Sequence, residues 1–126
     1  MPPTVAIIGA STDRSKYGNK SVRAHLQAGF TVYPVNPHAQ EVEGLRAYAR
    51  LEDVPGDLDR VSMYVPPKVG LSVLPAVASK KPKEFFLNPG SESEELVTEA
   101  ERLGLSPIQA CSIVAMGMDP SDMEEA

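Results

Sequence analysis

Positively charged side chains gather directly behind the first apolar segment of the chain. These cations are Arg14, Lys16, Lys20 and Arg23. The apolar run before them ends in Gly9-Ala10-Ser11, where a glycine without a Cβ lets the backbone come close to a ligand. The following residues open a helix, whose free N–H groups and positive dipole end favour an anion. The pattern therefore predicts a phosphate-binding turn for a nucleotide-like molecule, although a purely structural glycine turn beside a solvated, charged helix face would look the same.

Side chains that could act as nucleophile or base are few and scattered. Cys111 is the only thiol, and it is either a small buried residue at a strand end or a thiol facing the ligand groove. His25 lies in mid-helix, where we expect it to be exposed or half-buried. His38 follows a turn, either as a plain loop residue or at the groove rim, and these three residues make no metal-binding pattern. Because nucleophilic catalysis needs an activated group with a base in reach, we expect a binding module without chemistry of its own.

Short apolar runs bounded by Pro, Gly and Asn predict the strands that position these residues. The runs are 4–8, 31–35, 61–65, 84–87 and 107–110, and a further short edge strand is expected within 45–48. Several of the runs are rich in β-branched or aromatic residues, as strands are. We therefore expect a sheet of five to six strands.

Segments with helical periodicity lie between most of these strands. They are 18–28, 67 to about 79, and 93–103. In the first, Val22 and Leu26 are expected to face inward together, and in the second Pro75 should cause a kink or a late restart. The alternation of strands and helices predicts an α/β fold, with a Rossmann-like, doubly wound, mostly parallel sheet and helices on both faces.

Loops rich in Gly, Pro, Asn and Ser follow the predicted strands. They are 9–11, 36–37, 65–67, 88–90 and 111–112. In a doubly wound sheet the carboxyl ends of the strands meet at one edge, and ligands bind there. These loops are therefore expected to converge on the ligand.

The residues after the first two strands argue against a dinucleotide. The fingerprint G-x-G-x-x-G is absent, since Ser11 and Arg14 occupy the positions of its later glycines. The second strand ends in Val35-Asn36-Pro37, without the acid that would hold the ribose hydroxyls. NADP fits better than NAD, because Arg14 or Lys16 could meet its additional phosphate. No P-loop occurs in the sequence.

An ordered set of motifs runs through most of the chain. The motifs are Val5–Ser11, Val32–Pro37, Leu51–Pro55 and Val65–Pro67. Over about residues 4–115 the chain thereby resembles the small bacterial CoA-binding proteins, which are similar to the N-terminal domain of the succinyl-CoA synthetase alpha subunit. The resemblance implies a Rossmann-like CoA-binding domain over 1–115, and coenzyme A or an acyl-CoA as ligand. Residues 116–126 are expected to form an acidic, Met-rich and frayed tail.

The resemblance also implies which residues bind the ligand. The candidates for its phosphate-bearing part are Gly9, Ala10, Ser11, Arg14 and Lys16. The candidates for the groove flank, the adenine end and the pantetheine end are Asn36, Pro37, Val65, Pro66, Pro67 and Asn88. At the last position many members of the family carry a glutamine. CoA has a pyrophosphate and a ribose 3′-phosphate, so backbone N–H groups could hold one and the cations, Lys20 included, could meet the other.

Composition narrows the setting and leaves two other functions open. A formal net charge of -5 over 126 residues argues against nucleic acid as a partner. No apolar run approaches the ~18 to 20 residues of a membrane helix, and with a single cysteine and no signal segment we expect a cytoplasmic protein. Homo-oligomerisation through 113–118 stays open, as does an unknown partner subunit. The alternatives are an NAD(P)-linked oxidoreductase or its subunit, and an interaction protein that keeps the fold without a ligand.

Overall fold

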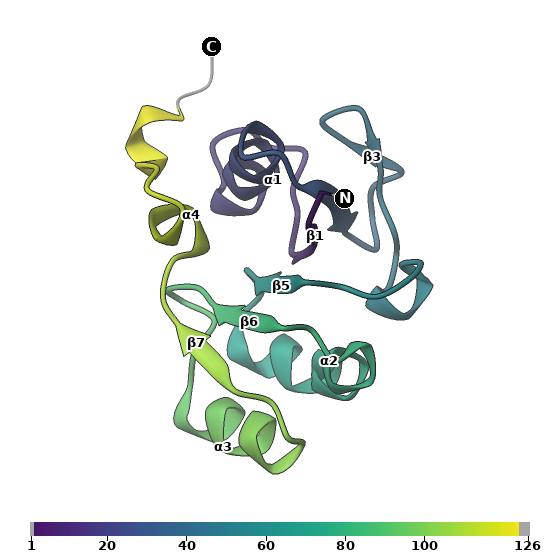
Figure 1. Cartoon of the computed structure of the whole chain (residues 1–126), viewed down its shortest axis with the longest axis vertical. Coiled ribbons are helices and arrows are strands. Elements are labelled where there is room, and N and C mark those ends of the chain that lie inside the picture. Colours follow the sequence, from purple (N-terminus) through teal and green to yellow (C-terminus); the bar gives the residue numbers. More distant parts are fainter. Residues whose placement is uncertain (1, 124–126) are drawn as a thin grey trace.

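A single parallel sheet organises the molecule, in a computed structural model that describes residues 2–123. The strands are β1 (Thr4–Ile8), β2 (Thr31–Val35), β5 (Arg60–Met63), β6 (Glu84–Leu87) and β7 (Pro107–Gln109). Their order across the sheet is β2-β1-β5-β6-β7, and every neighbouring pair is parallel (Figure 1). This confirms the predicted α/β sheet.

Helices cover both faces of this sheet, because the side chains of a buried strand alternate between two cores. The helices are α1 (Tyr17–Gln27), α2 (Pro67–Lys80), α3 (Glu94–Arg102) and the short α4 (Ser112–Ala115). Val5 and Ile7 of β1 pack in one core with Val22 of α1. Ala6 and Ile8 face the other core, which includes residues of α2 and α3. The doubly wound arrangement is therefore also as predicted. No helix in the described part of the chain is long and apolar enough to span a bilayer.

The segment after β2 differs from the expected edge strand. β4 (Leu45–Arg46) pairs with β3 (Glu41–Val42) in a separate antiparallel hairpin and does not join the main sheet. Tyr48 alone reaches the edge of β2, where its amide donates to the Pro34 carbonyl at 2.9 Å. Pro34 is tolerated there because an edge strand needs only one ladder of hydrogen bonds. The prediction was wrong because two-residue strands carry too little pattern to show their partner.

The structure corrects the expected inward face of α1 and excludes a late restart of α2. In α1, Val22 is fully buried, but Leu26 is 38% exposed and His25 takes the inward position instead. In α2, the helix runs from Pro67 to Lys80 without a restart. Pro75 lies on the exposed side of α2, so the carbonyl that its missing N–H leaves without a helical partner lies on that side and not in the core. The difference in α1 comes from which face of the helix the rest of the fold covers.

The C-terminal segment lies against α1. After α4, a single 3-10 turn, η2 (Pro120–Asp122), brings the chain to Met123, whose carbonyl accepts a hydrogen bond from Arg23 Nη2 at 3.2 Å. Figure 1 shows this segment beside α1. The last three residues of the predicted tail, 124–126, lie outside the described part of the chain.

Candidate functional site

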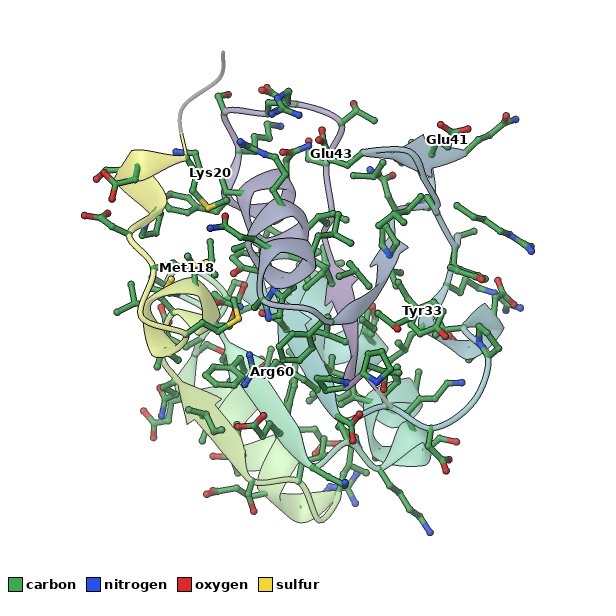
Figure 2. All side chains as sticks on the ribbon, turned by 45° about the horizontal axis from the view of Figure 1, so that its top comes forward. Lys20, Tyr33, Glu41, Glu43, Arg60 and Met118 are labelled. Atoms are coloured by element: carbon green, nitrogen blue, oxygen red, sulfur yellow. The ribbon has the colours of Figure 1, made fainter. Side chains whose placement is uncertain are left out.

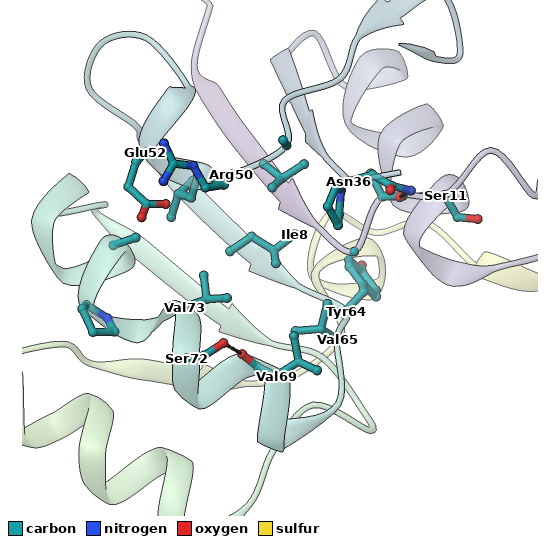
Figure 3. A pocket seen from close by; sticks show the side chains of 18 of the residues that line it. Ile8, Ser11, Asn36, Arg50, Glu52, Tyr64, Val65, Val69, Ser72 and Val73 are labelled. Carbon is teal, nitrogen blue, oxygen red and sulfur yellow. Dashed lines mark hydrogen bonds between the residues drawn. The ribbon is translucent and has the colours of Figure 1, made fainter. Parts of the chain in front are cut away.

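A groove of about 590 Å³ opens at the carboxyl ends of β1, β2 and β5. It lies where the winding of the sheet reverses, because the chain moves from β1 to β2 on one side and then to β5 on the other. Ile8 forms part of its floor, while the segment 49–52 and the α2 residues Val69 and Val73 line its sides (Figure 3). We call this the adenine groove, after the expectation from the sequence. Its middle is apolar and its ends carry polar side chains.

Two glycines bring β1, β5 and α1 unusually close at the end of this groove. Gly9 has a φ of +89°, and a Cβ on it would lie 3.0 Å from the Tyr64 carbonyl carbon and oxygen. A Cβ on Gly18 would lie 2.1 Å from the Gly9 carbonyl oxygen. Only glycine fits such contacts. The start of α1 is therefore held directly against the turn that follows β1.

Backbone carbonyls of this turn are occupied by side chains from the protein interior. Asn36 Nδ2 donates to the Ala10 carbonyl at 2.8 Å, and Asn19 Nδ2 donates to the Ser11 carbonyl at 2.9 Å. Arg23 Nη2 donates to the Arg14 carbonyl at 2.7 Å. These bonds fix the peptide groups of the turn with their carbonyls directed at protein donors.

Several backbone amides of the same turn, in contrast, make no hydrogen bond to the protein. Within residues 2–123, the N–H groups of Ala10, Ser11, Tyr17 and Gly18 have no protein acceptor. Helix α1 also lacks a side-chain cap and has no acid in its first turn. With the carbonyls held and the amides free, the segment 9–18 presents hydrogen-bond donors and the positive end of the α1 dipole. We call it the amide turn.

The cations behind this turn are not equivalent. Lys16 lines the adenine groove, whereas Arg14 lies outside it and forms an ion pair with Glu43 of the β3–β4 hairpin. Glu43 also accepts from Asn19 Nδ2 at 3.0 Å, and this bond, helped by Arg14, lowers the pKa of its carboxyl. Figure 2 shows Glu43 near the start of α1. Lys16 is therefore the cation best placed to meet an anionic ligand.

A second cavity of about 280 Å³ lies on the other side of the amide turn. It shares Gly9, Lys16, Tyr64 and Val65 with the adenine groove. Its own walls are Tyr17, Gly18, Pro66, Pro89, Gly90 and Ser91. We call it the second cavity. Because the two spaces meet at the turn, one elongated ligand could occupy both.

Most of the residues expected at the site line one of these cavities. Those at the adenine groove are Gly9, Ala10, Ser11, Lys16, Asn36, Pro37 and Val65. Pro66 lines the second cavity, and Arg14, Pro67 and Asn88 line neither. Pro67 is the first residue of α2, where its missing N–H has no structural consequence.

Asn88 is part of a buried hydrogen-bond network instead. It is 1% exposed, and its Nδ2 lies 2.8 Å from both the Ser62 hydroxyl and the Met63 carbonyl. Its Oδ1 accepts from the Ser112 amide at 2.8 Å, and the Ser112 hydroxyl in turn lies 3.0 Å from the Tyr64 hydroxyl. Asn88 therefore fixes the loop after β6 and the start of α4. Burial, with the Ser112 bond opposing it, raises the pKa of Tyr64.

Several lining residues were missed in the sequence. Tyr64 lines both cavities, and Arg50 and Glu52 lie together at the far end of the adenine groove (Figure 3). Val69 and Val73 are spaced one helical turn apart, and Val69 is 47% exposed. An apolar pair at i and i+4 directly after Pro66-Pro67 was the available signal, but the same spacing usually marks a core face.

The two histidines and the cysteine lie outside the lining of the two cavities. His25 is fully buried at the opposite edge of the sheet, which corrects the expectation that it would be exposed or half-buried. Its Nδ1 lies 2.8 Å from the Ser21 carbonyl and its Nε2 lies 3.2 Å from Arg60 Nη1, so both ring nitrogens are engaged. His38 is exposed, and Cys111 is half-buried directly before α4. Among residues 2–123, no three His, Cys, Asp or Glu side chains group closely enough to hold a metal ion.

Known proteins resemble both the sequence and the structure. An ADP-forming acetate–CoA ligase II from Archaeoglobus fulgidus is 35% identical over 96 residues, which cover 75% of this chain but 14% of the ligase. A conserved hypothetical protein from Pyrococcus furiosus superposes with a TM-score of 0.80 at 36% identity, covering 91% of this chain and 99% of that one. A dinucleotide-forming acetyl-coenzyme A synthetase 1 from Ca. Korarchaeum cryptofilum, solved with phosphate and ADP, gives 0.75 at 33% identity, over 86% and 26% of the two chains.

The chain matches only a small part of each ligase, but the family pattern covers nearly the whole chain. The chain spans between 14% and 17% of the length of the first curated ligases that it matches. The sequence pattern of the CoA binding domain, in contrast, matches residues 3–117, which include the amide turn and both cavities. This chain therefore belongs to the CoA binding domain family.

Proposed function

We propose that the protein binds coenzyme A or an acyl-CoA across the amide turn. The pyrophosphate lies against the free amides of the turn and beside Lys16. The adenine lies in the adenine groove, between the side chains of Val65, Val69 and Val73. The ligand is thereby oriented by backbone donors at its pyrophosphate and by apolar contacts with its adenine ring.

The observation that carries this proposal is the combination of held carbonyls and free amides at the turn. A backbone that merely needed to change direction would leave both kinds of group to solvent. Here Asn19, Asn36 and Arg23 occupy the carbonyls, and the amides that remain, at the positive end of the α1 dipole, favour an anion. Membership of the CoA binding domain family supports coenzyme A as the source of that anion.

We further propose that the protein has no catalytic group of its own at this site. Both nitrogens of the buried His25 are engaged in the opposite part of the fold. No histidine or acid in the described residues makes a hydrogen bond to Cys111, so its thiol has no base in reach.

Thermal unfolding with different ligands tests the proposal. A ligand at ~100 times its dissociation constant should add about 2.7 kcal/mol to the free energy of unfolding. We expect this stabilisation with CoA and much less with NAD or NADP, which tests the oxidoreductase alternative directly. Stabilisation by NAD alone would contradict the proposal, and none with any of the three would favour an interaction protein. Dephospho-CoA, as a fourth ligand, measures the contribution of the 3′-phosphate.

A further inference from the structure

Ser91 is a buried polar residue whose hydroxyl the fold leaves unused. It is 2% exposed and lines the second cavity, yet its Oγ has no hydrogen-bond partner within residues 2–123. No fully buried side-chain oxygen or nitrogen in the described residues lacks a partner. The Ser91 Oγ must therefore keep some accessible surface, and the space available to it is the second cavity. The protein leaves this hydroxyl free, so it can donate to or accept from a molecule that enters the second cavity.

The backbone at Ser91 is held firmly in place. Its amide donates to the Asn88 carbonyl at 2.9 Å, and the Asn88 side chain is bonded to the Met63 carbonyl and the Ser112 amide. The hydroxyl is thus attached to a loop that β5 and the start of α4 fix before any ligand arrives. Such a group binds with little loss of conformational entropy.

The remaining walls define what chemistry the cavity accepts. Tyr64, Val65, Pro66 and Pro89 offer mostly apolar surface, while the hydrogen-bonding groups are Lys16 and the Tyr17 and Gly18 amides on one segment and Ser91 on another. A chain of methylene groups interrupted by amides matches this arrangement, because it needs apolar walls with isolated polar partners. Coenzyme A carries such an arm beyond its pyrophosphate.

We propose that the second cavity holds the amide-bearing arm of the ligand and that the Ser91 hydroxyl hydrogen-bonds one of its amide groups. This inference rests on the proposed function, since the arm enters the second cavity only if the phosphates lie at the amide turn. Ser91 then discriminates ligands that have the arm from adenine nucleotides that end at the phosphates. The role expected at Asn88 belongs to its neighbour three residues later, and Asn88 positions that neighbour.

A comparison of two ligands with one variant tests this. The ligands are CoA and 3′-phosphoadenosine 5′-diphosphate, which has the same nucleotide and phosphates but no arm, and the variant is Ser91→Ala. Loss of one neutral hydrogen bond should weaken CoA binding about fivefold and leave the affinity for the truncated nucleotide unchanged. Equal losses for both ligands, or no loss for either, would overturn the role of Ser91.

Two further variants separate this role from a structural one. Ser72→Ala is the matched control, because Ser72 lines the adenine groove and its hydroxyl already donates to the Val69 carbonyl at 2.6 Å. It should change the affinities for both ligands by the same factor. Ser91→Leu, which fills the cavity, should abolish the advantage of CoA over the truncated nucleotide. If the wild-type chain binds neither ligand, the proposed function itself fails, and that result differs from every outcome in which only Ser91 is wrong.

Discussion

At the amino ends of the strands, Arg60 donates to Glu84 Oε1 at 2.9 and 3.1 Å and lies between the rings of Phe30 and Phe86. Its Nη1 also lies 3.2 Å from the buried His25. At the carboxyl ends, the amide turn and Ser91 have donors without protein acceptors. Both edges bury polar groups, but among the described residues the ring nitrogens of His25 are engaged within the protein, whereas the amide turn keeps backbone donors without protein acceptors. A binding site in this fold is marked by hydrogen-bonding capacity that the protein does not use, because buried polarity occurs at both edges.

The largest effect on stability and CoA binding should come from a substitution that pushes the start of α1 away from the turn after β1. In Gly18→Ala the new Cβ would lie 2.1 Å from the Gly9 carbonyl oxygen, so α1 must move away from the turn. We expect a loss of about 3 kcal/mol in the free energy of unfolding, at the upper end for overpacking, and loss of CoA binding. Urea unfolding and calorimetric titration measure the two. Gly44→Ala, at a φ of +78° with open space around it, is the control and should lower stability by about 1 kcal/mol without affecting CoA.

The edge at the amino ends of the strands, where His25 is buried, should make the stability of the protein depend on pH. Burial, reinforced by Arg60, lowers the pKa of His25 from 6.5 to about 4, even though the Ser21 carbonyl opposes the shift. The unfolded chain therefore takes up a proton at His25 more readily than the folded chain does. The free energy of unfolding keeps its full His25 contribution above pH 6.5 and loses it as the pH falls toward 4.

Urea unfolding at pH 7 and pH 5 gives the size of this effect. The His25 contribution to the difference should be about 2 kcal/mol, and His25→Gln should remove it. His38→Gln, which changes an exposed histidine at the ligand edge, should leave the pH dependence as it is. An unchanged slope in His25→Gln would show that the two edges do not differ as described.

Charge reversal at Lys16 tests which cation serves the ligand edge. Lys16 lines both cavities, and Lys16→Glu should weaken CoA binding at least about tenfold, equivalent to 1.4 kcal/mol. Lys20 lies over the Tyr17 ring at 5.3 Å and lines neither cavity, so Lys20→Glu should have a much smaller effect. Similar losses in the two variants would mean that the cations act only through the overall field.

The smallest predicted effect is a gain. Glu43→Gln keeps an acceptor for Asn19 but removes the negative charge that neutralises Arg14. The affinity for CoA should rise about threefold at low ionic strength and the gain should shrink as salt is added. Glu41→Gln, on the same hairpin and exposed, is the matched control (Figure 2). A fall in affinity would show that the ion pair itself shapes the amide turn.

The sequence was sufficient for the fold and for most of the turn. Apolar runs such as 4–8 are long enough to show a strand buried on both faces, and their alternation with helices determines a parallel sheet. The glycine turn was recognisable because its residue types permit few other structures. These features depend on neighbours along the chain.

The features that were missed depend on partners far along the chain. His25 is buried because Arg60, 35 residues later, offers it a hydrogen bond, and Arg14 is neutralised by Glu43, 29 residues away. Asn88 and Ser91 lie in one loop and both are buried, but only Asn88 bonds to the distant Ser112 at the start of α4. The local pattern of apolar and polar residues does not show which distant residues will be in contact.

The shared wall of the two cavities has a consequence for competition inside a cell. Once one half of a molecule that extends through both cavities is bound, the other half is held near its own cavity at a high effective concentration. The affinity of the whole molecule therefore exceeds that of either half alone by orders of magnitude. Under the proposed function, free adenine nucleotides fill one space only and gain nothing from the other. Selectivity against abundant nucleotides can then arise from connectivity, without any single contact that rejects them.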